Sequence, residues 1–338
     1  MAKQIVRQYR GGRGQIITFA PRLKYALGPV SISHYLRGIG RGRYGARALP
    51  REQAADLFGQ VLDGRVSDLE IGAFSIAMRF KGITLDEMAG FLDATHARLT
   101  RLPATGRPLV VLPSYNGARR LPVLTPLLAL LVARAGLPVL LHGCQTEDGR
   151  VSAQAVLAAL GIPALDAVRT IADGELTHAG TALLCPGMKR LLDTRQTIGL
   201  RNPGHSVVKL MQPGSGAQLI ISSYTHPEYA DVMTATFEHM GMSGMLSKGT
   251  EGESVADPRR TLQIDGFVRG AHRILQAKQA GTPDALAGLP PAADASATAA
   301  YTRRVLEGEL PIPEAIERQA AYIRALAREL EPSGSPHM

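Results

Sequence analysis

Short apolar runs alternate with segments of helical periodicity from Leu109 onward, and this alternation constrains the fold more than any other feature of the chain. Buried strands are predicted at residues 109–112, 138–142, 182–185, 217–222 and 245–248. Helices are predicted between them, at residues 125–135, 152–160, 188–194 and 227–239. Strands that alternate with helices are typical of a largely parallel sheet covered by helices. The sequence therefore predicts an α/β domain here.

The preceding segment, residues 52–100, is predicted to be entirely helical. Apolar residues at 54, 57, 58, 61 and 62 follow helical spacing, and Gly64 ends that helix. Ser67 and Glu70 have the spacing of a capping box, as do Thr84 and Glu87, and each box predicts the start of a further helix. Three short capped helices of this kind predict a small helical domain.

The C-terminal part is less regular. Residues 265–278 are predicted to be a helix with Arg269 and Arg273 one turn apart, and the Ala/Pro-rich residues 282–300 are predicted to be a linker. Residues 312–330 are predicted to form a final amphipathic helix. The predicted organisation is a basic segment at 1–50, a helical domain at 51–105, an α/β domain at 106–280, and a linker with a C-terminal helical segment at 281–338.

Positive charge is concentrated at the start of the chain. The first 51 residues contain 11 Lys or Arg, and no acidic residue occurs before Glu52. The remaining residues contain 27 basic and 29 acidic groups, so the formal net charge of +9 comes entirely from this first segment. Such an asymmetry is expected of a surface that meets a polyanion. The alternative explanation is a solvated, flexible tail.

Composition indicates an ordinary globular protein, with 45% hydrophobic and 20% charged residues. The most apolar run, residues 121–141, is interrupted by three prolines and an arginine, so we expect no membrane span. Cys144 and Cys185 are the only cysteines and lack CxxC spacing, which indicates reduced thiols in the cytoplasm. A mitochondrial presequence is the alternative for the Arg-rich start, although this start is Gly-rich and Ser-poor.

The helical segment resembles a known family. Residues 49–91 are similar to the helical domain of anthranilate phosphoribosyltransferase, and the specific part is Gly72-Ala-Phe74 followed by the segment Met78-Arg-Phe-Lys-Gly-Ile-Thr84. The similarity continues at low identity to about Arg269. The resemblance implies a nucleoside-phosphorylase-like fold, with a small helical domain against an α/β domain, and commonly a homodimer joined through the helical domains. A fold by itself does not imply an activity.

Four motifs that hold the phosphoribosyl donor in that family are altered in this chain. The glycine loop after the first strand of the α/β domain corresponds to Pro113-Ser-Tyr-Asn-Gly117, where proline lacks an N–H and tyrosine adds bulk. The other three motifs correspond to residues 123–126, 141–144 and 252–255. The family's phosphate-pairing lysine is absent from them, and the carboxylates Glu251 and Glu253 are out of register with its metal-binding motif. Because a diphosphate needs Mg²⁺ and backbone or lysine donors, we expect no donor binding, no metal and no cofactor.

A second resemblance is more specific. Residues 113–119 and 248–253 are similar to those of the YbiB group of bacterial proteins, which implies a homodimer that binds DNA and other nucleic acids with little sequence preference. Arg-Gly repeats at 10–14 and 41–45, interleaved with Tyr9, Tyr25, Tyr35 and Tyr44, are typical of basic segments that follow a strand backbone. Neither zinc-finger spacing nor an aromatic RNA-binding strand is present, so phosphate contacts are expected to dominate.

The sequence therefore predicts a cytoplasmic homodimer that binds DNA or RNA and is not an enzyme. The predicted nucleic-acid contacts are Arg7, Arg10, Arg13, Arg37, Arg41, Arg43, Arg47, Lys81, Arg269 and Arg273. One alternative is a divergent glycosyl or phosphoribosyl transferase or phosphorylase with a different substrate, which Glu251, Glu253 and Asn116 would contact. Another is a protein-interaction scaffold whose basic face meets an acidic partner.

The remodelled cleft is a second candidate site. Its predicted residues are Ser114, Tyr115, Asn116, Arg119, Arg120, His142 and Arg195. They are expected either to take a phosphate or a nucleotide end, or to cap the next helix and fill the old pocket. The resemblance aligns Arg195 with an arginine that contacts the acceptor in the transferases, and an exposed helix-end arginine is the alternative. His178, His205, His226 and His239 have no mutual metal spacing.

Overall fold

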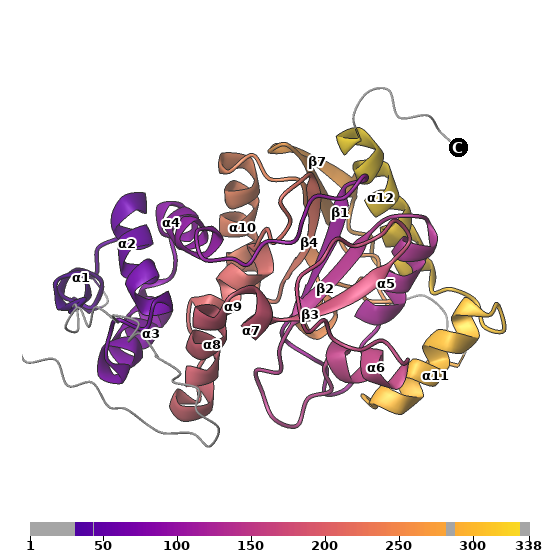
Figure 1. Cartoon of the computed structure of the whole chain (residues 1–338), viewed down its shortest axis with the longest axis horizontal. Helices are drawn as coiled ribbons and strands as arrows, with labels where there is room; N and C mark the ends of the chain where they lie inside the picture. The colour runs from indigo at the N-terminus through magenta and orange to yellow at the C-terminus, as the bar shows by residue number, and fades with distance from the viewer. Residues whose placement is uncertain (1–30, 43, 282–287, 332–338) are drawn as a thin grey trace, which may run out of the picture.

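A helical domain lies beside a larger α/β domain, so the predicted fold class is confirmed (Figure 1). The computed structural model describes residues 31–42, 44–281 and 288–331. The helical domain contains α1 (Ser33–Ile39), α2 (Arg51–Leu62), α3 (Asp68–Lys81) and α4 (Leu85–His96). No helix in the described ranges is long and apolar enough to cross a membrane.

Both predicted capping boxes are formed. The Ser67 side chain accepts from the N–H of Glu70 at the start of α3, and Thr84 accepts from the N–H of Glu87 at the start of α4. The two glutamates also act over longer distances. Glu70 accepts a 3.0 Å hydrogen bond from the N–H of Ile32, which ties α1 to α3, and Glu87 accepts one of 3.0 Å from the N–H of Leu49. The local signals that begin these helices thus also fix the chain that precedes them.

An aromatic cluster forms the core of the helical domain. The rings of Phe58 and Phe91 stack at 4.5 Å, and Phe74 lies edge-on to Phe91 at 6.0 Å. Helix α8 (Pro186–Ile198), from the middle of the predicted α/β segment, packs against α2 and α3. Arg190 of α8 donates a 2.6 Å hydrogen bond to the carbonyl of Leu62, so the chain returns to the helical domain halfway along its length.

The α/β domain has a seven-stranded sheet in the order β3-β2-β1-β4-β5-β6-β7. The strands are β1 (Leu109–Ser114), β2 (Val139–Gly143), β3 (Leu176–Gly180), β4 (Gln218–Tyr224), β5 (Gly244–Lys248), β6 (Ile264–Val268) and β7 (Ala271–Gln276). The first five are parallel, and β6 and β7 are antiparallel. The loops that follow β1, β4 and β5 therefore lie at one edge of the sheet, where ligands bind in open α/β folds.

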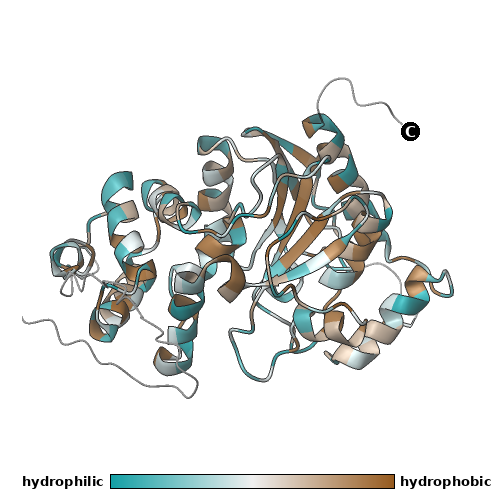
Figure 2. Ribbon diagram, viewed as in Figure 1, coloured by the Kyte–Doolittle hydropathy of each residue, from teal (hydrophilic) through white to brown (hydrophobic). Residues whose placement is uncertain are grey.

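Successive residues of the central strands point to opposite faces of the sheet, and each face has its own hydrophobic core. Val111 of β1 and Ile220 of β4 belong to the core shared with the helical domain and α10 (Pro227–His239), while Val110 and Leu219 belong to the core on the opposite face. The helices on that opposite face are α5 (Thr125–Arg134), α6 (Ala153–Ala159), α11 (Ala295–Leu306) and α12 (Glu314–Leu330). Figure 2 shows the apolar strands between these layers. Burial on both faces explains why the strands are continuous apolar runs.

Two predicted elements are wrong. Residues 182–185, predicted as a strand, fall mostly in the short helix α7 (Thr181–Leu184), and the third strand is β3 immediately before it. Residues 265–278, predicted as a helix, form the β6–β7 hairpin. Its turn consists of Arg269 (φ 50°) and Gly270 (φ 84°), and two residues with positive φ make the tight turn that suits twisted antiparallel strands. Arg269 and Arg273 are therefore not on a helix face.

The predicted linker at 282–300 is also partly wrong, because residues 295–300 belong to α11. Asp294 caps α11 by accepting a 2.6 Å hydrogen bond from the N–H of Ala297. Residues 282–287 lie outside the described ranges. The final predicted helix is confirmed as α12, which packs on α5 and on β4 to β6.

Candidate functional site

The loop that follows β1 is held by a buried glutamate from the loop that follows β5. Glu253 is 1% exposed, and its carboxylate accepts hydrogen bonds from the backbone N–H groups of Asn116 (2.9 Å) and Gly117 (2.7 Å). The hydroxyls of Ser114 (2.5 Å) and Thr125 (3.2 Å) donate to the same carboxylate. Four donors therefore surround one internal anion, as amides and hydroxyls surround a bound phosphate at a helix or loop terminus.

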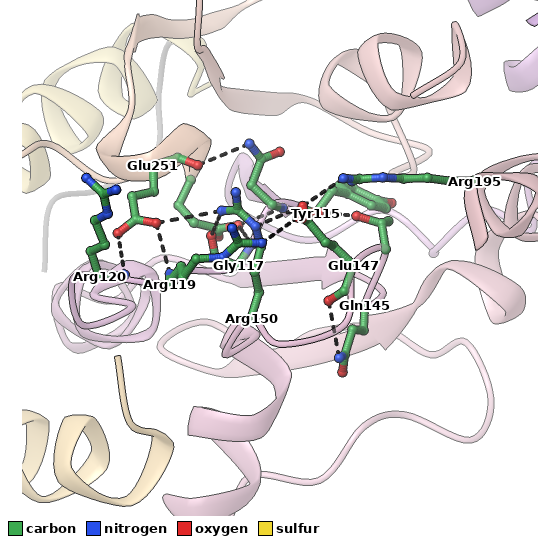
Figure 3. Close-up of polar contacts among 12 residues, drawn as sticks. Tyr115, Gly117, Arg119, Arg120, Gln145, Glu147, Arg150, Arg195 and Glu251 are labelled. Carbon is green, nitrogen blue, oxygen red and sulfur yellow. Dashed lines mark hydrogen bonds and ion pairs between the residues drawn. The ribbon is translucent and has the colours of Figure 1, made fainter. Parts of the chain in front are cut away.

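A second glutamate occupies the rest of this loop. Glu251 accepts from the backbone N–H groups of Arg119, Arg120 and Leu121, each at 2.9 Å (Figure 3). Its backbone has a φ of 50°, an unfavourable conformation for a residue other than glycine. We refer to residues 113–121, with Glu251 and Glu253 bound to them, as the sealed loop.

The side chain of Tyr115, a residue of the sealed loop, points into the interior and meets His142 of β2. The Tyr115 hydroxyl is 2.8 Å from Nδ1 of His142, and Thr181 donates to that hydroxyl at 3.2 Å. Both side chains are buried, and burial lowers the pKa of His142 to about 3, so its imidazole is neutral. A small cavity bounded by residues 114–117 and 144–152 has a volume of about 10 Å³, enough for one water molecule.

A much larger cavity of about 790 Å³ lies beside the sealed loop, between the two domains. The end of α3, the segment 201–209, and the loops after β4 and β5 line it. We call it the interdomain cleft. Of the predicted cleft residues, Asn116 and Arg195 line it, whereas Ser114, Tyr115 and His142 do not. Arg119 and Arg120 are exposed beside it, and their backbone N–H groups bind Glu251.

A single acidic side chain in the cleft, that of Glu147, forms ion pairs with three arginines. Glu147 accepts from Arg119 (2.7 Å), Arg150 (2.9 Å) and Arg195 (2.7 Å), as Figure 3 shows. Nη1 of Arg195 is buried and has no hydrogen-bond partner within the described ranges. The prediction that Arg195 is part of a cleft is thus consistent with its position, and its guanidinium is only partly satisfied by the protein itself.

Three further residues of the cleft were not predicted as site residues. Lys209 is buried and donates to the carbonyls of Ser223 (3.0 Å) and Gly252 (3.1 Å), and burial lowers its pKa to about 8. Arg201 and His205 lie on the same segment and line the same cavity. The sequence offers only a weak indication of them, which is a basic residue soon after Gly199, the residue that ends α8. Their proximity to Arg195 depends on the turn between α8 and α9 (Gly204–Val207), which no local pattern records.

Comparison with known proteins places this architecture. A family model described as the helical bundle domain of the glycosyl transferase family matches residues 33–98. The protein YbiB of Escherichia coli (strain K12) is 38% identical over 293 residues, which cover 85% of this chain and 91% of that protein. The chain belongs to the YbiB family. Both predicted resemblances are confirmed.

The YbiB family chain is also related to anthranilate phosphoribosyltransferases. The enzyme of Nocardioides sp. (strain ATCC BAA-499 / JS614) is 27% identical over 296 residues, covering 85% of this chain and 86% of the enzyme. The crystal structure of anthranilate phosphoribosyltransferase from Thermus thermophilus has a TM-score of 0.67 at 21% identity, covering 88% of each chain. The likeness to the solved structure demonstrates a shared fold.

The predicted nucleic-acid contacts are distributed over several elements in this YbiB family member. Arg37 on α1, and Arg41 and Arg47 after it, are exposed. Arg269 is exposed in the β6–β7 turn, and Arg273 on β7 forms an ion pair with Glu329. Arg7, Arg10, Arg13 and Arg43 lie outside the described ranges.

Lys81 differs from the other predicted contacts. Its side chain is 7% exposed and forms an ion pair of 2.5 Å with Glu87, the glutamate of the second capping box. The ammonium also donates to the carbonyl of Gly82 at 2.8 Å. Because both its charge and its hydrogen bonds are used within the helical domain, Lys81 stabilises the start of α4 and is not a surface cation.

Proposed function

We propose that this protein is a nucleic-acid-binding homodimer built on a phosphoribosyltransferase fold whose donor site is occupied by its own carboxylates. The observation that carries the proposal is the sealed loop. Five backbone N–H groups between Asn116 and Leu121 donate to Glu251 or Glu253, which leaves them without capacity for a diphosphate. Nucleic acid is the proposed partner because the positive excess of the chain lies outside this loop.

The sealed loop argues against donor binding on two physical grounds. A phosphoribosyl diphosphate placed at Asn116 and Gly117 would have to displace the buried Glu253 carboxylate from their N–H groups. The negative charges of the diphosphate and of this carboxylate would also repel each other. The carboxylates of Glu251 and Glu253 are engaged by loop donors and so do not fit a Mg²⁺ site, which requires oxygen ligands free to coordinate. We therefore propose no reaction through a metal-bound donor.

The basic start of the chain supports nucleic acid as the partner. The first 51 residues contain 11 cations and no anion, and three of them, Arg37, Arg41 and Arg47, are exposed. Clustered cations of this kind gain free energy by replacing the counterions of a phosphate backbone. Because the contacts would be mainly to phosphates, binding should depend little on base sequence.

An exposed apolar stripe on α3 supports the homodimer. Leu69 is 84% exposed and Phe80 is 86% exposed, and Ala73 and Ile76 lie between them at helical spacing. Large apolar side chains at such exposure indicate an interface, and a second copy of the chain is the proposed occupant because the family resemblance implies joining through helical domains. Light scattering should give the mass of a dimer for the wild type and of a monomer for Leu69→Asp with Phe80→Asp.

Salt titration tests nucleic-acid binding. If six to ten phosphates are neutralised, the affinity for a random single-stranded oligonucleotide should fall by roughly 10³ to 10⁵ between 50 and 200 mM salt. Reversing the charge of Arg41 and Arg47 should weaken binding to unrelated sequences about equally. Fluorescence anisotropy measures both. An affinity that hardly changes with salt, or a loss confined to one sequence, would contradict the proposal.

A divergent transferase or phosphorylase is the second candidate, and the 790 Å³ interdomain cleft is the observation that favours it. This volume is in the range of small-ligand pockets. A ligand that binds only the folded protein stabilises it by about 2.7 kcal/mol at a hundredfold excess over its Kd. Stabilisation of that size by phosphoribosyl diphosphate and Mg²⁺, measured by thermal denaturation, would favour the enzyme. It would reject the proposal that the sealed loop excludes the donor.

A further inference from the structure

The floor of the interdomain cleft presents an arginine that the protein does not neutralise. Arg201 is partly buried and lines the cavity, and within the described ranges it has no hydrogen bond or ion pair. Burial lowers its pKa most, the nearby Arg195 and Arg150 lower it further, and Glu147 acts in the opposite direction. A partly buried cation without a partner, beside two other arginines, is unfavourable, and this arrangement is explained if a ligand supplies the anion.

His205 provides a second unsatisfied group at the same place. Its side chain is 7% exposed, and its Nδ1 contacts Asn202, whose backbone N–H lies 3.3 Å away. The other ring nitrogen, Nε2, is buried and has no partner in the described part of the chain, although the ring lines the cavity. Buried ring nitrogens are nearly always hydrogen-bonded, so an unpaired Nε2 that borders a cavity marks a contact for a ligand.

Positive charge predominates around these two residues, although Glu147 also lines the cleft and pairs with Arg195. Arg195 retains an unpaired buried Nη1, and Lys209 donates only to neutral oxygens of Ser223 and Gly252. Burial lowers the pKa of His205 to about 3, and Arg201 and Arg195 contribute to that lowering. A bound anion would reverse these unfavourable interactions, since it would attract the same groups that now repel one another.

The size and charge of the cleft indicate which anion fits. A cavity of about 790 Å³ accommodates one nucleotide-sized group rather than a length of polymer. A terminal phosphate carries a charge of about −1.5 to −2 at neutral pH, whereas a phosphate within a strand carries −1 and is flanked by chain on both sides. An arginine and an imidazole together suit the oxygens of such a terminal group.

We propose that the interdomain cleft binds a phosphomonoester group, carried by the end of a nucleic-acid strand or by a free mononucleotide, and that Arg201 and His205 contact its phosphate. Binding of a strand end rests on the proposed nucleic-acid function, while binding of a free nucleotide does not. The proposed phosphate contacts, Arg201 and His205, differ from those of the adjoining sealed loop, where the backbone donors already have anions.

The test uses the full-length protein and one single-stranded oligonucleotide, prepared with a terminal phosphate at its 5′ end, at its 3′ end, or at neither. The wild type should bind a phosphorylated form about tenfold more tightly than the hydroxyl form, as expected for one charge-assisted contact. Arg201→Gln and His205→Gln should lose this preference and should retain the affinity for the hydroxyl form. Arg324→Gln, which removes an exposed arginine of α12, should change neither.

Adenosine 5′-monophosphate and adenosine distinguish the two sources of the phosphate. Stabilisation by the monophosphate alone, with no oligonucleotide binding, would support the free-nucleotide form and would reject the nucleic-acid function. Oligonucleotide binding without any preference for a terminal phosphate, together with equal melting shifts from the two adenosine compounds, would overturn the proposal and leave the nucleic-acid function intact. Circular dichroism melting checks that each variant folds, and Arg201→Gln changes a partly exposed side chain.

Discussion

The sealed loop and the interdomain cleft lie next to each other at the same edge of the sheet, and they treat charge in opposite ways. In the sealed loop, two carboxylates are matched by backbone and hydroxyl donors, and Glu253 is completely enclosed. In the cleft, Arg201 and Lys209 have no carboxylate partner among the residues described. One region is a saturated anion site, and the other is an unsaturated one.

The difference shows that the position of a site in a fold does not determine its chemistry. Both regions follow parallel strands whose carboxyl ends favour ligand binding. The geometry of the β1 loop still directs amides toward an anion, but that anion belongs to the protein. The Glu147 carboxylate, which binds Arg119 of the loop and Arg195 of the cleft, joins the two regions and sets how much positive charge the cleft retains.

The largest expected effect comes from opening the sealed loop. Glu253→Ala should lower the free energy of unfolding by about 4 kcal/mol, because the N–H groups of Asn116 and Gly117 and two hydroxyls lose a charged acceptor in a buried place. Urea denaturation measures the change. Inorganic phosphate should then stabilise the variant more than the wild type, since it can occupy the vacated nest.

Glu251→Ala is the matched control for this prediction. Glu251 also binds three backbone N–H groups, but it is less buried, so water can replace its carboxylate and the loss should be about 1–2 kcal/mol. Equal losses for the two variants, or no greater benefit of phosphate for Glu253→Ala, would mean that the loop is not an occupied anion site.

A smaller effect should appear as a dependence of stability on pH. Burial lowers the pKa of His142 to about 3 in the folded protein from its ordinary value of 6.5, so the unfolded chain binds its proton first as the pH falls. Its contribution to stability is therefore complete above pH 6.5 and is lost progressively down to about pH 3. Between pH 7 and pH 5 the loss should be about 2 kcal/mol.

His142→Asn should remove this part of the pH dependence, measured by denaturation at the two pH values. Tyr115→Phe is the control, because it removes the hydroxyl that contacts His142 but keeps the imidazole. It should lower stability at both pH values and preserve the slope. An unchanged slope in His142→Asn would show that solvent reaches the space behind the sealed loop.

The parts of this fold that could be predicted from the sequence are those with local signals. Ser67 and Thr84 begin their helices through contacts three residues away, which a linear pattern records. The β3 strand was missed because its sequence, Leu-Thr-His-Ala-Gly, is polar for a buried strand. The β6–β7 hairpin was missed because Arg269 stands where such turns favour asparagine or glycine.

The candidate site was only partly predictable, because its chemistry depends on contacts distant in sequence. Glu253 and Asn116 are 137 residues apart, and no local pattern assigns one as the acceptor of the other's N–H. The altered loop at Pro113–Gly117 could be recognised from the family resemblance, but the carboxylates that occupy it could not. Arg201 and His205 likewise acquire significance only when the fold brings Arg195 and Lys209 beside them.

The smallest expected effect concerns the residue that joins the two regions. Glu147→Gln removes the carboxylate shared by Arg119, Arg150 and Arg195, so more positive charge is available to an anion in the cleft. Because Glu147 is partly exposed, the gain in affinity for adenosine 5′-monophosphate should be modest, about three- to fivefold by calorimetric titration. Glu329→Gln, which frees Arg273 outside the cleft, changes the net charge equally and should have no effect. A weaker affinity in Glu147→Gln would instead mean that this carboxylate holds the arginines in position for the ligand. In that case the unsaturated charge of the cleft would depend on Glu147, which also binds the sealed loop, and the two regions would function as one.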